Sequence, residues 1–210
     1  MTLNVFFVVS CVYNYKKIKG LRSLFLYSIL SLSQSFIGIY VNVFKSYTIA
    51  SEEFLENSIN IFIVLEFIIF YLFLISAIKS RLIRMLMQLT LLMFLISTLS
   101  YWIISNGFNE GPAILTVLES YLIILPCLYY YYELFKIPSS KRILDESKFW
   151  TITGMLFLFA FLIPIFLQRN NIFWNFRYLY RTAYSITFIG YTILFVFFLK
   201  AIQCRIKTTT

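Results

Sequence analysis

Three charged residues lie inside long apolar segments, where charged side chains are rare. Glu66 and Glu119 each end a Val-Leu-Glu triplet, roughly two helical turns past Ile59 and Pro112, and Arg181 lies at a similar depth in the last segment. A charged side chain at membrane depth is costly unless it is paired, protonated or in contact with water, so such residues usually mark functional sites. The three residues are therefore the first candidates for a binding site.

The charges of these three residues do not balance. Arg181 can neutralise one carboxylate, and in a medium of low dielectric constant the other must carry a proton or pair with a bound cation or an ammonium group. The residue types thus predict proton-coupled switching, cation binding or capture of a small amine. Two alternatives stay open: the residues only hold helices together, or Arg177 and Arg181 reach the lipid headgroups.

Further polar residues are expected at the same depth. Counted at ~1.5 Å per residue from Ile59, Pro112 and Phe173, the two glutamates and Arg181 lie on the order of 10–12 Å below the outer helix ends. The predicted cytoplasmic half has no comparable polar layer, which favours a pocket open to the outer face over a route through the membrane. No metal or cofactor site is predicted. The predicted ligand-binding residues are Glu66, Glu119, Arg181, Gln34, Ser97 and Tyr184.

The elements that position these residues are apolar helices. The chain is 60% hydrophobic and only 13% charged, far from the roughly 25% charged residues of soluble domains. Its apolar segments are continuous over the ~20 residues that a spanning helix needs, which excludes the alternating strands of a membrane barrel. The sequence predicts an all-α transmembrane bundle with spans at Leu21–Phe44, Phe54–Ile78, Leu82–Ser105, Pro112–Phe135, Phe149–Leu167 and Phe173–Leu199.

A seventh apolar segment, Leu3–Tyr15, comes first and is short. As a helix it would extend about 20 Å, less than the ~30 Å hydrocarbon core. It either spans in a thin or tilted arrangement, lies in the interface, or has its true start upstream. We expect seven spans, or six if this segment is interfacial. A signal peptide is not expected, because no basic region precedes Leu3 and no small-residue cleavage site follows Ser10.

Basic residues predict the orientation in the membrane, since Lys and Arg are retained on the cytoplasmic side. Three basic residues, Lys45, Arg169 and Arg177, fall on one set of loops. With a spanning first segment, the N-terminus is outside and the C-terminus inside, in the cytoplasmic (inner) membrane. The opposite face carries fourteen: Lys16, Lys17, Lys19, Arg22, Lys79, Arg81, Arg84, Lys136, Lys141, Arg142, Lys148, Lys200, Arg205 and Lys207.

Composition and loop length exclude several classes of protein. The hydrophilic stretches at 45–57 and 136–148 are too short for a soluble domain, so residues 1–210 form a single transmembrane domain. The net charge of +9 is dispersed over loops, which indicates topology and attraction to anionic headgroups, with no nucleic-acid partner. Three widely spaced cysteines imply no disulfide or zinc site. Histidine is absent, which removes the commonest metal ligand and general base.

Two patterns concern helix organisation. The shared Val-Leu-Glu triplets are offset by 53 residues, which indicates either a parallel duplication of a helix pair or a coincidence in a Leu-, Ile- and Phe-rich chain. Four consecutive tyrosines, Tyr129 to Tyr132, end the fourth of the six long segments. They fit an interfacial aromatic belt, and because they cover every side of a helix, at least one should point inward.

One stretch resembles a known group of proteins. The segment from Leu128 through the tyrosine run and Glu133 to Phe149, Trp150 and Gly154 is similar to a stretch in small seven-helix integral membrane proteins of bacteria that remain uncharacterised. The resemblance implies a helical membrane protein, for some members with a link to signalling. It carries over no functional residue.

No catalytic or channel motif is present, so we do not expect an enzyme. The leading hypothesis is a seven-helix sensory or signal-input protein that binds a small cationic or amine ligand at its outer face. Because no output domain is present, it would act through a protein partner at the basic cytoplasmic loops. The alternatives are a small-solute or cation permease, which substrate flux in liposomes would reveal, and a structural subunit of a membrane complex, which would tolerate loss of both glutamates.

Overall fold

The computed structural model describes residues 9, 22–43, 49–104, 113–136, 143–167 and 177–209. Every regular element in these residues is helical, which confirms the all-α prediction. Six of the helices are long and apolar enough to cross a membrane, as expected of a multi-pass membrane protein. The elements are α2 (Arg22–Val43), α3 (Ile49–Ala77), α4 (Arg81–Ile104), α5 (Ala113–Lys136), the short 3₁₀ turn η2 (Ile143–Asp145), α6 (Ser147–Leu167) and α8 (Arg177–Thr209).

The seventh span and the orientation stay predictions. The first apolar segment, Leu3–Tyr15, lies outside the described residues except for Val9. The six long segments match helices closely, but α3 begins about one and a half turns before its predicted segment and α8 continues almost three turns beyond its own. Apolar composition marks where a helix leaves the lipid, whereas the backbone hydrogen bonds of a helix can continue into water.

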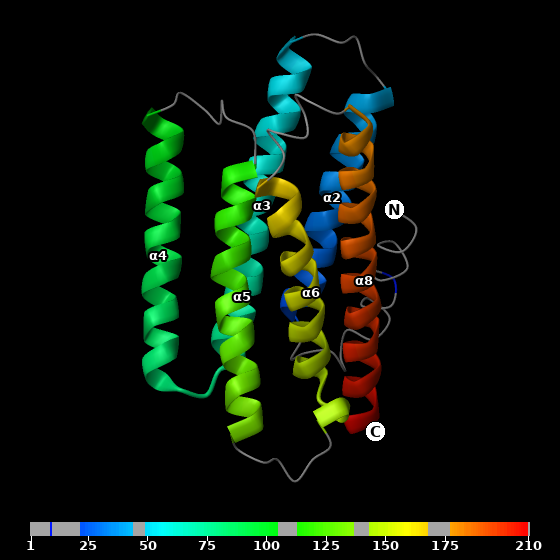
Figure 1. Cartoon of the computed structure of the whole chain (residues 1–210). Coiled ribbons are helices and arrows are strands. Elements are labelled where there is room, and N and C mark those ends of the chain that lie inside the picture. Colours follow the sequence, from blue (N-terminus) through cyan, green and yellow to red (C-terminus); the bar gives the residue numbers. More distant parts are fainter. Residues whose placement is uncertain are drawn as a thin grey trace.

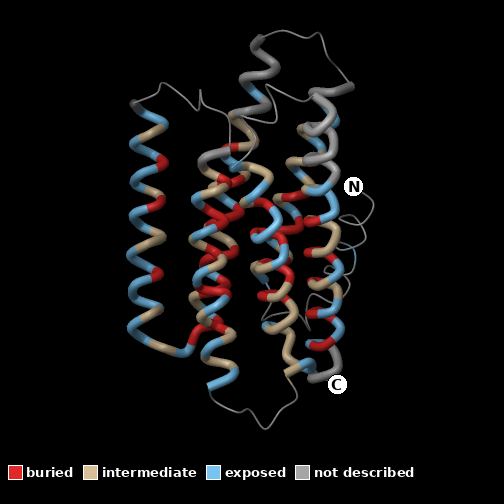
Figure 2. Tube along the Cα trace, in the orientation of Figure 1, coloured by how far each residue is buried: buried red, intermediate tan, exposed pale blue. Residues whose placement is uncertain are grey.

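The helices run side by side along the bundle, with α4 at one edge and α8 at the other (Figure 1). The central helix, α3, contacts α2, α4 and α5, while α6 packs against α5 and α8. Buried positions concentrate where α3, α5, α6 and α8 face one another, whereas α4 is mostly exposed (Figure 2). This arrangement places α3 and α5 so that polar side chains on both can share the core.

Aromatic side chains from four helices fill the core. Tyr27 of α2, Phe70 of α3, Phe159 of α6 and Phe198 of α8 are fully buried. The ring centroids of Tyr27 and Phe70 lie 4.5 Å apart, and the Phe70 ring meets the Phe159 ring edge-on at 5.8 Å. Such pairs add to the stabilisation from apolar burial. The cluster therefore fixes α2, α3, α6 and α8 relative to one another.

Candidate buried carboxylate site

The structure brings Glu66 of α3 and Glu119 of α5 together inside the bundle. Each residue is only 1% exposed, and their carboxylates lie close enough to act on each other electrostatically. The neighbouring helices α3 and α5 both contribute a buried face at this level, so neither carboxylate can turn toward solvent. Two like charges so close in a low-dielectric interior are unfavourable unless a proton or a cation lies with them.

Tyrosine hydroxyl groups from two further helices reach the same place. The hydroxyl of Tyr191 on α8 donates a long hydrogen bond of 3.5 Å to Oε2 of Glu66. The hydroxyl of Tyr27 on α2 lies near both glutamates without reaching hydrogen-bonding geometry to Glu66. The site therefore joins α2, α3, α5 and α8, and it holds two acidic groups and two phenol groups.

Several polar atoms around this site are unsatisfied. Among the described residues, Oε1 of Glu66, Oε1 of Glu119, the Tyr27 hydroxyl and both amide atoms of Asn60 are buried without a hydrogen-bond partner. Asn60 is 0% exposed and lies about 9 Å from Glu66 along α3, toward the start of that helix. Buried polar atoms are nearly always paired in folded proteins, most of all at membrane depth. The cluster thus has the donors and acceptors to hold a small polar ligand.

Apolar residues close the site on the side of the α3–α4 connection. One and two turns further along α3 from Glu66 are Phe70 and Leu74, and the equivalent positions after Glu119 on α5 are Ile123 and Cys127. All four are 0% exposed. On this side of the carboxylates, the positions one and two turns along both helices are therefore filled by apolar side chains.

Two other predicted ligand-binding residues lie elsewhere in the bundle. The side-chain amide of Gln34 donates a 3.4 Å hydrogen bond to the hydroxyl of Ser58, which joins α2 to α3. Ser97 is exposed on α4, and its hydroxyl donates to the carbonyl of Phe94 on its own helix. The structure thus places Gln34 at a helix contact and Ser97 on the surface of the bundle.

Arg181 and Tyr184 lie on α8, but their side chains are outside the described residues. The partner of Arg181 therefore stays a prediction. Asn60, Tyr27 and Tyr191 were not among the predicted ligand-binding residues. Asn60 is a polar residue within an apolar helix, the same signal that identified Glu66. The two tyrosines gave no such signal, because the chain contains 16 tyrosines.

A second polar cluster ties the basic end of the bundle together. Both carboxylate oxygens of Glu133 on α5 accept backbone hydrogen bonds, from the N–H of Lys79 at 2.8 Å and of Ser80 at 2.9 Å. Nζ of Lys148 on α6 donates to the carbonyl of Ser76 at 3.1 Å. These contacts fasten the α3–α4 connection to α5 and α6. Glu133 was not predicted as a site, and its role here is structural.

The side chains of the tyrosine run, Tyr129 to Tyr132, differ in how far they are buried. Tyr130 is 6% exposed, whereas Tyr132 is 56% exposed, so at least one of the four side chains points inward as predicted. The hydroxyl of Tyr131 lies 2.6 Å from the hydroxyl of Thr153 and links α5 to α6. The run therefore contributes both to the surface and to helix packing.

Comparisons with protein-family models, with curated proteins and with solved structures give no significant match. The residues of this chain, foremost those of the four helices that converge on Glu66 and Glu119, are therefore the basis for inferring a function.

Proposed function

We propose that this chain is a membrane signal-input protein that binds a proton or a small cation, such as an amine, beside Glu66 and Glu119. The observation that carries the proposal is the buried carboxylate pair, in which each glutamate has an oxygen with no hydrogen-bond partner among the described residues. A proton shared by the pair, or a cation between the two carboxylates, removes the repulsion and satisfies the free oxygens.

Binding at this site would change how helices pack. Glu66, Glu119, Tyr27 and Tyr191 come from α3, α5, α2 and α8, so a ligand that draws their polar groups together acts on four helices at once. A ligand shifts a conformational equilibrium only as far as it prefers one state. The charge state of the carboxylate pair provides that preference, and a partner at the basic loops would respond to the helix shift.

Apolar packing on one side of the carboxylates supports a receptor over a transporter. The inward-facing positions of α3 and α5 beyond the carboxylates are filled by Phe70, Leu74, Ile123 and Cys127. Transport routes usually have polar groups or broken helices on both sides of the midplane. A permease stays the second candidate, because Glu66 lies near the middle of the apolar span Asn57–Ala77, the depth at which transporters bind their substrates.

Thermal unfolding of the purified protein in detergent tests the proposal. We expect the midpoint to fall as the pH rises from mildly acidic to mildly alkaline, because loss of the shared proton leaves two repelling carboxylates in the core. Methylammonium should raise the midpoint at alkaline pH more than sodium at equal ionic strength. Glu66→Gln and Glu119→Gln should each flatten the pH profile and abolish the methylammonium effect. Glu133→Gln, which removes a carboxylate outside the site, is the matched control.

The alternatives predict different results. If the wild type and both glutamine variants share one pH profile, the carboxylates only join helices, and a structural subunit becomes the better description. Flux of methylammonium into liposomes that contain the wild type but not Glu66→Gln would favour the permease. A pH-dependent and cation-dependent midpoint without flux supports the signal-input protein.

A further inference from the structure

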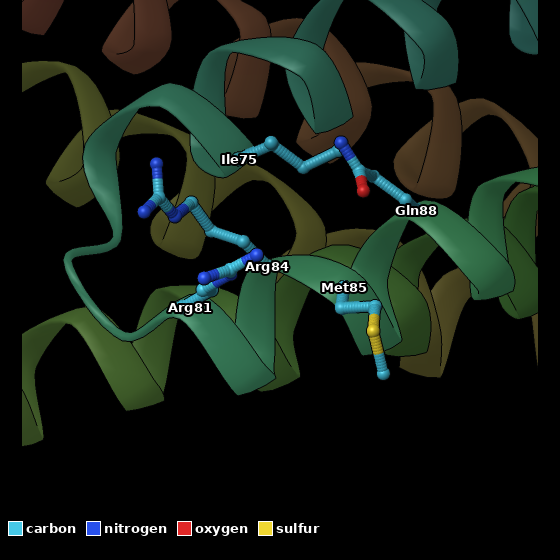
Figure 3. Close-up of a pocket in the computed structure, with 5 residues that line it drawn as sticks. All are labelled: Ile75, Arg81, Arg84, Met85 and Gln88. Atoms are coloured by element: carbon cyan, nitrogen blue, oxygen red, sulfur yellow. The ribbon is translucent and has the colours of Figure 1, made fainter.

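A cavity of about 430 Å³ lies between the end of α3 and the first turns of α4. It is lined by Ile75 of α3 and by Arg81, Arg84, Met85 and Gln88 of α4, and Figure 3 shows Gln88 extending from α4 toward Ile75. At ~1.5 Å per residue, Ile75 lies more than 13 Å along α3 from the buried carboxylate site. The cavity is therefore a separate feature, at the end of the bundle predicted to face the cytoplasm.

The positive charge of this cavity is not neutralised by the described part of the chain. Neither Arg81 nor Arg84 forms an ion pair with a described acidic residue. Glu133, an acidic residue at the same end of the bundle, accepts the backbone N–H groups of Lys79 and Ser80 instead. The N–H groups of Lys79 and Ser80 in the α3–α4 connection are thus already occupied, and two guanidinium groups remain to bind an anion.

An exposed apolar stripe leads away from the cavity along α4. Residues four, seven and eleven positions after Met85 lie on the same side of the helix as Met85. The stripe that they form extends about 27 Å, close to the thickness of the ~30 Å hydrocarbon core. The cavity therefore opens onto a surface that hydrocarbon chains can cover. The stripe consists of Met85, Leu89, Leu92, Ile96, Leu99 and Ile103, each more than half exposed.

From this juxtaposition we infer that the cavity is a binding site for the headgroup of an anionic phospholipid. Arg81 and Arg84 bind the phosphate, a geometry that the planar guanidinium favours. The amide of Gln88 donates to a phosphate or glycerol oxygen, and an acyl chain lies along the stripe that begins at Met85. Basic pockets between membrane helices on the cytoplasmic side recognise such headgroups. A soluble phosphate would use the two arginines but not the apolar stripe.

Native mass spectrometry of the protein in detergent, with added dioleoyl phosphatidylglycerol, tests this inference. The wild type should retain the anionic lipid in preference to dioleoyl phosphatidylcholine. The variant Arg81→Gln/Arg84→Gln should bind phosphatidylglycerol roughly thirtyfold more weakly, because each basic residue near a headgroup contributes about one factor of five to ten. The matched control Lys136→Gln/Lys200→Gln removes two exposed charges, one from the end of α5 and one from the C-terminal third of α8, and should keep wild-type affinity.

Three outcomes overturn the assignment. If the control variant loses as much bound phosphatidylglycerol as the arginine variant, the lipid is attracted by the basic surface in general and not by this cavity. Undiminished binding in the arginine variant would place the lipid elsewhere. Equal thermal stabilisation by inorganic phosphate and by phosphatidylglycerol would show that the site recognises a soluble anion. If the double variant does not fold, the single variants Arg81→Gln and Arg84→Gln should each lose about fivefold in affinity.

Discussion

At the scale of single residues, glutamates in this chain occupy two kinds of environment. Glu66 and Glu119 are buried beside each other, and each keeps an unpaired oxygen. Glu133 is partly exposed, and both its oxygens accept backbone N–H groups. A carboxylate that accepts two N–H groups at a helix start is electrostatically satisfied. The functional candidates are therefore the pair whose bonding is incomplete.

Replacement of Glu133 should lower the stability of the protein. We expect Glu133→Ala to lower the free energy of unfolding by about 2 kcal/mol, because two backbone donors lose their charged acceptor. Glu133→Gln keeps one acceptor oxygen and should lose about half as much. The measurement is reversible unfolding in mixed micelles. Asp145→Ala, which removes an exposed acidic residue at the same end of the bundle, should leave stability unchanged, and an equal loss there would contradict the prediction.

At the scale of elements, α3 and α5 present the same buried face. Positions 116, 119, 120, 123, 126, 127 and 130 of α5 are buried, and each position 53 residues earlier in α3 is buried as well. A duplicated helix pair would have buried positions at this constant offset of 53 residues. Part of the agreement, however, follows simply from the presence of one buried glutamate in each helix. The partners differ, since α4 lies at the edge of the bundle and α6 lies inside it. Duplication stays a prediction.

The contact between α6 and α8 depends on glycine. A Cβ atom at Gly154 would lie 2.9 Å from Cβ of Phe197 and 3.3 Å from Cδ1 of Leu194. At Gly190, an added Cβ would meet only Cδ1 of Leu158, at 3.3 Å. Small residues allow membrane helices to approach closely. The two glycines thus differ in whether their neighbour can move.

This difference predicts opposite effects of the same substitution. Gly154→Ala should destabilise the protein by about 1–3 kcal/mol, because Cβ of Phe197 moves only with its backbone. Gly190→Ala should be neutral or stabilising by up to about 1 kcal/mol, because the Leu158 methyl group can turn aside and alanine favours a helix. Unfolding free energies of the two variants in the same micelles provide the comparison. If Gly190→Ala lowered the unfolding free energy more than Gly154→Ala, the contact at Gly154 would not be the one that sets the distance between α6 and α8.

At the scale of the whole molecule, exposed positions lie along every helix of the bundle (Figure 2), and many of them carry large apolar side chains. An apolar surface of this extent is unstable in water and is the surface that lipid covers. Basic residues at the α3–α4 connection, at the end of α5 and in the last turns of α8 lie at one end of the bundle. The whole structure thus separates a lipid-covered belt from a basic end.

Labelling with a membrane-impermeant maleimide tests the predicted orientation. In a chain with Cys11, Cys127 and Cys204 replaced by serine, Ser51→Cys should react in intact cells and Lys79→Cys only after permeabilisation, because basic loops stay in the cytoplasm. Thr2→Cys should react from outside if the first segment spans, and only after permeabilisation if that segment is interfacial. Labelling of Lys79→Cys in intact cells would reverse the orientation.

Local composition is sufficient to predict the helices and to identify the polar residues within them. In lipid the backbone must satisfy its own hydrogen bonds, so an apolar run of about twenty residues has one solution, and a helix results regardless of its neighbours. The same cost made Glu66 and Glu119 conspicuous, since a carboxylate at that depth needs a partner. Both conclusions follow from local composition.

The contacts between helices could not be predicted from local composition and are known from the three-dimensional structure. The long segments are apolar on all sides, so periodicity does not reveal the inward face, and the sequence contained no sign that Ser97 lies on an exposed helix. The pairing of Glu66 with Tyr191 and of Glu133 with the α3–α4 connection joins residues far apart in the chain. Such contacts depend on how side chains of whole helices fill the interior, which no local pattern specifies.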